Sequence, residues 1–96
     1  MTQLEKLNIL RNDLQRPSKS QDDYLKALLG QAEALLERQG VYDDGTYDYS
    51  MLCVDYASFL FRKRADPNMN MPRFLRHQIM QILTSQKLRG VKKNDI

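Results

Sequence analysis

The sequence YDYSMLCVDYASFLFRKRAD, residues 47–66, decides the fold. Its apolar residues recur at helical spacing and cover most of the circumference of the helix that they predict. One face carries Tyr49, Cys53, Tyr56, Ala57 and Leu60, and other directions carry Met51, Val54 and Phe61. The polar strip is narrow and consists of Asp48, Asp55, Ser58 and Arg62. Because such a helix is normally surrounded by partners, we predict a central helix that its own chain covers on one side and another subunit covers on the other.

Two helices are predicted before the central one. Residues 3–14 form a short helix with one leucine stripe at three- and four-residue spacing, which consists of Leu4, Leu7, Leu10 and Leu14. Residues 21–39 form the clearest amphipathic helix in the chain. The hydroxyl of Ser20 is the expected cap of this second helix, and Gly40 is its expected stop.

A turn and a fourth helix complete the expected bundle. The turn residues 41–46, VYDDGT, precede the central helix, and Thr46 or Asp48 is its expected cap. Pro72 fits the first position of a fourth helix, because the amide hydrogen that proline lacks is unbonded there in any case. The residues on the apolar face of this helix are Met71, Leu75, Ile79, Ile82 and Gln86. No period-two strand pattern occurs, so we predict an all-α fold, a compact bundle of about four helices.

The length and composition predict one small domain. With 96 residues the chain has room for a single core, and we expect a helical domain over residues 1–88 and a flexible basic tail over residues 89–96. No apolar run approaches the roughly 18 residues of a membrane span, and the N-terminus lacks the pattern of a secretory signal. Cys53 is the single cysteine, so it predicts neither a disulfide nor a zinc site. We therefore expect assembly in the cytoplasm, without a cofactor.

The charge is unevenly distributed along the chain. Residues 1–56 carry six Lys or Arg against ten Asp or Glu, a net charge of −4, whereas residues 57–96 carry nine against two, a net charge of +7. This division fits nucleic acid at the basic end, or head-to-tail association of identical subunits through acidic and basic surfaces. Solvated charges that only keep the domain in solution are the plain alternative.

Two groups of residues are the candidate contact sites. The cations that end the central helix and begin the fourth are Arg62, Lys63, Arg64, Arg73 and Arg76. The acidic and aromatic residues around the start of the central helix are Tyr42, Asp43, Asp44, Tyr47 and Asp48. Cations at the end of a helix complement its dipole, but five positive charges within 15 residues exceed what capping requires. They are consistent with phosphate contact, whereas no helix-turn-helix pattern supports sequence-specific reading of bases.

No residue pattern indicates catalysis. His77, the single histidine, falls on the polar side of the fourth helix, and Cys53 falls on the core face of the central helix. Glu33 and Glu37 are one turn apart on a face that we expect to be solvated together with Lys26. A glycine-rich phosphate loop and metal-ligand spacings are missing from the sequence. We therefore expect no enzymatic activity and no bound metal.

The ordered features resemble the small phage head–tail connector proteins, an adaptor family whose subunits form a ring beneath the portal. The resemblance covers residues 4–86 and rests on four stretches, LEKLNILRNDL, DDYLKALLGQAEALLERQG, YDYSMLCVDYASFLFRKRAD and MPRFLRHQIMQIL. By position, Arg62, Lys63 and Arg64 match the cationic end of the family's central helix. Met71 and Pro72 match the start of its last helix. The turn ADPNMN, residues 65–70, is shorter than the loop that the family often carries there.

What the resemblance implies is an all-α adaptor of the virion, without enzymatic activity, made in the bacterial host cytoplasm and placed at the head–tail junction. Its implied partners are its own copies in a ring, the portal protein, a tail-side stopper or completion protein and, without sequence preference, the packaged DNA. No membrane is implied. The alternative hypothesis is a small helical DNA-binding or regulatory module that contacts phosphates through its basic C-terminal half.

Overall fold

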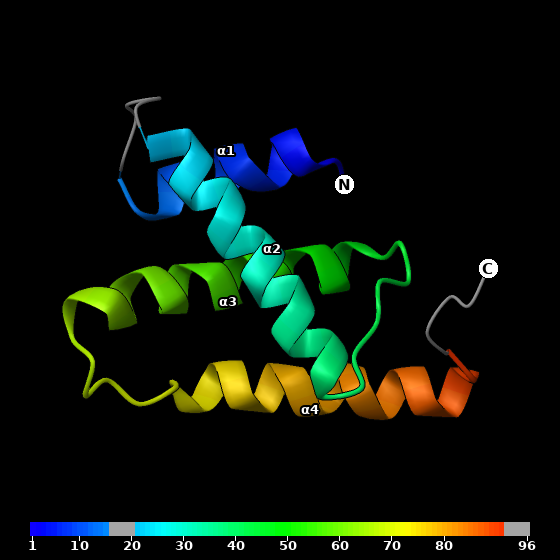
Figure 1. Cartoon of the computed structure of the whole chain (residues 1–96). Coiled ribbons are helices and arrows are strands. Elements are labelled where there is room, and N and C mark those ends of the chain that lie inside the picture. The colour runs from blue at the N-terminus through cyan, green and yellow to red at the C-terminus, as the bar shows by residue number, and fades with distance from the viewer. Residues whose placement is uncertain (16–20, 92–96) are drawn as a thin grey trace.

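Four helices make up the described part of the chain. The computed structural model describes residues 1–15 and 21–91 and contains α1 (Gln3–Asp13), α2 (Asp22–Arg38), α3 (Tyr47–Ala65) and α4 (Arg73–Arg89), with no strand among these residues. In Figure 1, α3 and α4 lie side by side and run in opposite directions, while α2 crosses in front of α3. α1 packs on both α2 and α3. The predicted all-α bundle is confirmed.

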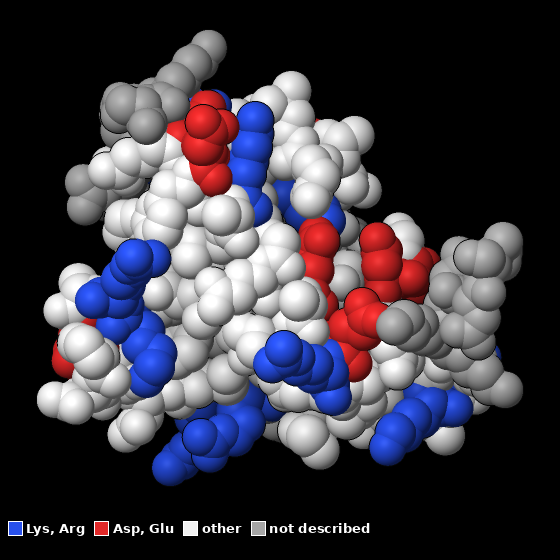
Figure 2. Space-filling view, viewed as in Figure 1, with Lys and Arg blue, Asp and Glu red and all other residues white. Residues whose placement is uncertain are grey.

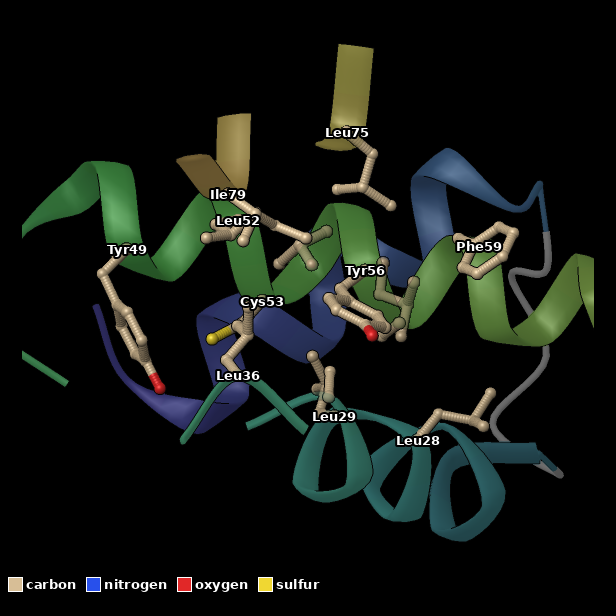
Figure 3. Close-up of a cluster of buried hydrophobic side chains, with 14 of the residues drawn as sticks. Leu28, Leu29, Leu36, Tyr49, Leu52, Cys53, Tyr56, Phe59, Leu75 and Ile79 are labelled. Atoms are coloured by element: carbon tan, nitrogen blue, oxygen red, sulfur yellow. The ribbon is translucent and has the colours of Figure 1, made fainter. Parts of the chain in front are cut away.

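α3 is the central helix of this bundle, because it packs against all three other helices. Figure 3 shows its buried side chains between leucines of α2 and residues of α4. The buried apolar residues of α3 are Tyr49, Leu52, Cys53, Val54, Tyr56, Ala57 and Phe59. Those labelled in Figure 3 that meet them from α2 and α4 are Leu28, Leu29, Leu36, Leu75 and Ile79. The core predicted around the central helix is therefore confirmed.

The expectation that another subunit covers one whole side of α3 is wrong, although Tyr47 and Met51 near its start stay accessible. α1, α2 and α4 cover almost all of its apolar circumference, and even its polar strip finds partners inside the molecule. The Ser58 hydroxyl donates a hydrogen bond to Asp13 of α1 at 2.6 Å, and the Gln78 amide of α4 donates one to Asp55 at 3.1 Å. The large apolar residues that are exposed lie mostly on other elements and are Met1, Leu4, Tyr47, Phe74, Met80 and Leu88.

α1 turns most of its predicted leucine stripe toward the core, since Leu7 and Leu10 are buried and Leu14 is partly buried. Leu4 is exposed, and Lys6 is buried instead. The Lys6 ammonium lies 3.0 Å from a carboxylate oxygen of Glu33, so its charge is paired while its aliphatic stem packs in the interior. Glu33 is therefore paired and partly buried, with its side chain 31 % exposed, whereas Glu37 and Lys26 are exposed as expected.

The helix ends show which of the expected caps form. Thr46 caps α3, because its hydroxyl oxygen accepts a hydrogen bond from the backbone N–H of Tyr49 at 3.1 Å. Gly40 follows α2 with a φ of +91°, a conformation that favours glycine. Pro72 precedes α4 as its cap and is not its first residue. Ser20, the expected cap of α2, lies outside the described residues.

α4 continues one residue beyond the expected domain boundary. Arg89 is its last helical residue, and Gly90 follows as the cap with a φ of +72°. Arg89 belongs to the folded bundle, since its guanidinium lies 2.8 Å from the carboxylate of Asp44. The expected tail therefore starts later than residue 89, and residues 92–96 lie outside the described part of the chain.

Replacing Leu52 by Ala is expected to lower the free energy of unfolding by about 2–5 kcal/mol, since Leu52 is 0 % exposed in the middle of α3. Urea unfolding followed by circular dichroism measures the change. Leu88→Ala is the matched control, because Leu88 is 84 % exposed and the same truncation should change stability by less than about 0.5 kcal/mol. Equal effects of the two substitutions would contradict the central position of α3.

Candidate functional site

The acidic candidate residues lie at the end of the bundle where α3 begins and α4 ends. Four of the five form what we call the acidic end, which consists of Tyr42, Asp43, Tyr47 and Asp48. Tyr42 is partly buried and the other three are exposed. Within the described ranges, no side-chain hydrogen bond or ion pair engages Tyr47 or Asp48. The acidic end is therefore open to a partner.

The fifth predicted residue, Asp44, forms hydrogen bonds inside the molecule and is not part of that surface. One carboxylate oxygen accepts hydrogen bonds from the Arg89 guanidinium at 2.8 Å and from the Gln86 amide at 3.1 Å. The other accepts bonds from the backbone N–H and the hydroxyl of Thr46, at 3.0 and 2.6 Å. With its side chain only 5 % exposed, Asp44 joins the loop to α4 instead of meeting a partner.

Gln86 is the residue of this region whose role the sequence analysis missed. It lies on the inner face of α4 as predicted, and it is buried there in order to place its amide group against the loop that precedes α3. Its amide oxygen accepts a hydrogen bond from the backbone N–H of Tyr42 at 2.9 Å, and its amide nitrogen donates one to the Tyr42 carbonyl at 2.6 Å. A glutamine on an apolar helix face is the signal, because a buried amide requires partners. We call Asp44, Gln86 and Arg89 the loop clamp.

The loop clamp sets the protonation of Asp44. Burial alone would raise the pKa of its carboxyl group, but hydrogen bonds from Thr46, Arg89 and Gln86 outweigh burial and lower the pKa to about 2. This pKa lies below the 3.8 of an unperturbed aspartate, so the ionised group stabilises the folded state at neutral pH. The contribution is lost as the pH falls from about 4 towards 2.

The predicted cations lie at the opposite end of α3, where the chain turns into α4. We call them the basic end, which consists of Arg62, Lys63, Arg64, Arg73 and Arg76. Lys63 serves the fold, because its ammonium donates hydrogen bonds to the carbonyls of Pro67 and Met69 at 3.2 and 2.8 Å. These bonds hold the turn between α3 and α4.

Two other cations of the basic end also have contacts inside the molecule. The Arg64 guanidinium lies 5.2 Å from the centroid of the Tyr24 ring, and it donates a hydrogen bond to the Tyr24 hydroxyl at 3.3 Å. The Arg62 guanidinium lies 3.6 Å from the Asp13 carboxylate, and the Arg62 side chain is 53 % exposed. Both remain accessible, but part of their charge is already engaged.

Arg73 and Arg76 are the free cations of the basic end. Both are exposed, and neither makes a hydrogen bond or ion pair with another residue in the described ranges. They stand at the start of α4, near the positive end of its dipole, and no acidic residue accompanies them in the first turn. Such a placement lowers stability, so helix capping does not explain it.

α3 holds the two charged ends apart. A helix of 19 residues spans about 28 Å, and α4 runs antiparallel beside it. Figure 2 shows basic side chains on the left and lower left, where α3 ends and α4 begins, and a group of acidic side chains on the right, beside the loop that precedes α3. Further basic side chains follow the lower edge. The two ends of α3 therefore differ in charge, although Lys87 and Arg89 of α4 lie at the same end as the acids and a further acidic group lies at the upper left of the view.

The other candidate residues form no reactive site. Cys53 is buried as predicted, and burial raises the pKa of its thiol to about 11. His77 is exposed as predicted. In residues 1–15 and 21–91, no three His, Cys, Asp or Glu side chains are grouped so as to hold a metal ion, and no helix is long and apolar enough to span a membrane. That the protein is not an enzyme stays a prediction.

Replacing Asp44 by Asn is expected to lower the free energy of unfolding by about 1–3 kcal/mol at neutral pH, because it weakens the charged hydrogen bonds of the loop clamp. The difference from the original protein should shrink as the pH falls from about 4 to about 2, where Asp44 itself takes up a proton. Urea titrations at a series of pH values measure both effects. Asp43→Asn, at an exposed carboxylate, is the control. A difference that stays constant with pH would exclude the Asp44 charge from the clamp.

Replacing Arg73 by Glu is expected to raise the free energy of unfolding of the isolated chain by about 0.3–1 kcal/mol, because an acid then faces the positive end of the α4 dipole. Thermal unfolding at low and high salt measures the gain, which should fall as salt screens it. Lys87→Glu, in the last turn of the same helix, is the control with the opposite sign. A loss of stability in Arg73→Glu would mean that Arg73 has a structural partner.

Comparison with known proteins gives no match for this chain. No family model matches it, no curated protein does, and no solved structure does. Its function is therefore inferred from the two charged ends of the molecule and from the way α3 separates them.

Proposed function

We propose that the protein is a structural connector subunit that binds copies of itself head to tail. The observation that carries this proposal is the polarity of the bundle. The free cations Arg73 and Arg76 lie at one end of α3, and the exposed acids Asp43 and Asp48 lie at the other. A subunit with opposite charges at opposite ends attracts the next copy in the same orientation and repels it in the reverse one.

Charge alone is a weak source of affinity. An exposed ion pair contributes about 0–1 kcal/mol and is screened by salt, so it sets the orientation of the contact more than its strength. Each end, however, also exposes an aromatic side chain, Phe74 at the start of α4 and Tyr47 at the start of α3. Aromatic residues supply much of the apolar area that protein interfaces bury. The two ends therefore combine attraction with apolar contact.

Repeated head-to-tail contacts close into a ring when the rotation between neighbours permits it. A ring is the arrangement of the phage head–tail connectors, which the order of helices and cations in this chain resembles. We therefore place the ring at the head–tail junction of a virion, where it docks on the portal protein, extends the DNA channel and receives a tail-side completion protein. Cations that no neighbouring copy covers then face the portal or the packaged DNA. The subunit carries out no chemical step.

A DNA-binding module is the second candidate, and one observation favours it. Arg73, Arg76 and Lys87 are exposed on α4, and this helix contains no acidic residue. Their positions place them along one edge of the helix, where they can contact successive phosphates without reading bases. On this hypothesis the affinity for duplex DNA falls steeply with salt, and the acidic end has no role.

Two complementary variants distinguish these functions. Asp43→Lys with Asp48→Lys reverses the acidic end, and Arg73→Glu with Arg76→Glu reverses the basic end. Each variant then has two ends of like charge, so neither should assemble alone, whereas an equimolar mixture should assemble in alternation because every contact between the two variants joins opposite charges. Sedimentation velocity at low salt measures the assembly of the original protein and of both variants, alone and mixed.

Lys26→Glu with Arg38→Glu is the matched control, because it makes the same charge change at exposed positions of α2 and should leave assembly unchanged. An original protein and a mixture that both stay monomeric would overturn the head-to-tail proposal. Binding to duplex DNA is measured in the same buffers. A steep salt dependence that disappears when Arg73 and Arg76 are reversed, without any effect of the acidic end, would establish the second candidate instead.

A further inference from the structure

A pocket of about 470 Å³ lies at the acidic end, between the start of α3 and the C-terminal half of α4. Its apolar lining comes from Met51 and Ile82, and Gln81 and Ser85 contribute polar groups. Asp48 also lines the pocket, and no described residue forms a hydrogen bond or ion pair with its carboxylate. Thr46, Gln78 and the paired Asp44 and Arg89 also line it, so the pocket combines a small apolar area with one carboxylate, Asp48, that has no partner among the described residues.

Phe74 is the complementary feature at the basic end. Its side chain is 65 % exposed, although it is a large aromatic residue in the first turn of α4. The free cations Arg73 and Arg76 accompany it in the same short segment. An exposed aromatic ring that stands among cations matches a pocket that offers Met51 and Ile82 beside the carboxylate of Asp48.

We propose that Phe74 of one copy occupies the pocket beside Asp48 of the next copy, with Arg73 and Arg76 close to that carboxylate. This inference rests on the proposed head-to-tail association, in which the contact of Phe74 with the pocket joins neighbouring copies. Burial of the ring against Met51 supplies affinity, and the opposite charges supply orientation.

The main competing arrangement is a two-fold contact between the α4 helices of two copies. Two copies that packed α4 against α4 in antiparallel fashion would also bring the aromatic ring near the pocket. In that arrangement Arg73 and Arg76 of one copy would meet Lys87 and Arg89 of the other, and α4 has no acidic residue to relieve the repulsion. The head-to-tail arrangement brings the same two cations to Asp48 and also to Arg89, because both residues line the pocket. The two arrangements therefore differ in the number of copies that they join, since only the antiparallel contact closes at a dimer.

Disulfide cross-linking tests the contact. In a double variant, His77→Cys with Ser85→Cys, the two thiols lie about 12 Å apart along α4, too far for a bond within one molecule. His77 is one turn from Phe74 and Ser85 lines the pocket, so disulfides should form between copies. Cys53 is fully buried and should not react. Mild oxidation is expected to give a ladder of dimers, trimers and larger species on a non-reducing gel.

Adding Phe74→Ala to this double variant should reduce the yield of cross-linked species by about fivefold or more, because the ring that fills the pocket is removed. Adding Leu88→Ala is the matched control. Leu88 is also an exposed apolar residue of α4, but it does not line this pocket, so the yield should stay within about twofold.

Each other outcome overturns the inference. Products that stop at the dimer indicate the antiparallel arrangement. An unchanged yield with Phe74→Ala excludes the ring as the anchor, and head-to-tail association then stands if Arg73→Glu with Arg76→Glu abolishes the ladder. A yield no higher than that of a Leu4→Cys, Ser85→Cys variant, whose first thiol lies on α1, removes both this contact and the proposed function.

Discussion

The burial of α3 between the other three helices is the constraint on which the rest of the structure depends. α1 and α2 cover one side and α4 covers the other, so a chain of 96 residues encloses a helix that is apolar nearly all round. The polar groups of α3 then need internal partners, as the pairs of Ser58 with Asp13 and of Asp55 with Gln78 show. Burial, reinforced by the negative charge of Asp13, raises the pKa of Asp55 even though Gln78 donates a hydrogen bond to it.

An enclosed α3 also divides the charged residues into those that hold the fold and those that are left for partners. Asp44 and Lys63 belong to the first group, because their hydrogen bonds fasten the segments on either side of α3. Asp48, Arg73 and Arg76 belong to the second group. The two arginines stand where the dipole of α4 disfavours them, and a local rule that is broken without a compensating contact is expected at functional positions.

The sequence predicted the helices and the general position of the two charged ends. It did not predict which polar residues form hydrogen bonds and ion pairs with distant parts of the chain. Gln86 illustrates the difference. Helical spacing placed it on the inner face of α4, yet its partners, the backbone of Tyr42 and the carboxylate of Asp44, lie more than 40 residues away in the chain. The same holds for Lys6 and Glu33, which are 27 residues apart and meet only when α1 packs on α2.

The sequence by itself determined the helical class, the inward face of α2 and α4, a cap at Thr46 or Asp48 and the opposite charges of the two halves. Each of these depends on residues within a few positions of one another, so a local pattern is sufficient. Only the tertiary structure decided that α3 is covered by its own chain and that the exposed apolar residues include Phe74 on α4. It also decided that Asp44 is bonded within the loop clamp and does not face a partner. These properties depend on which distant segments come into contact, and helical periodicity carries no information about that.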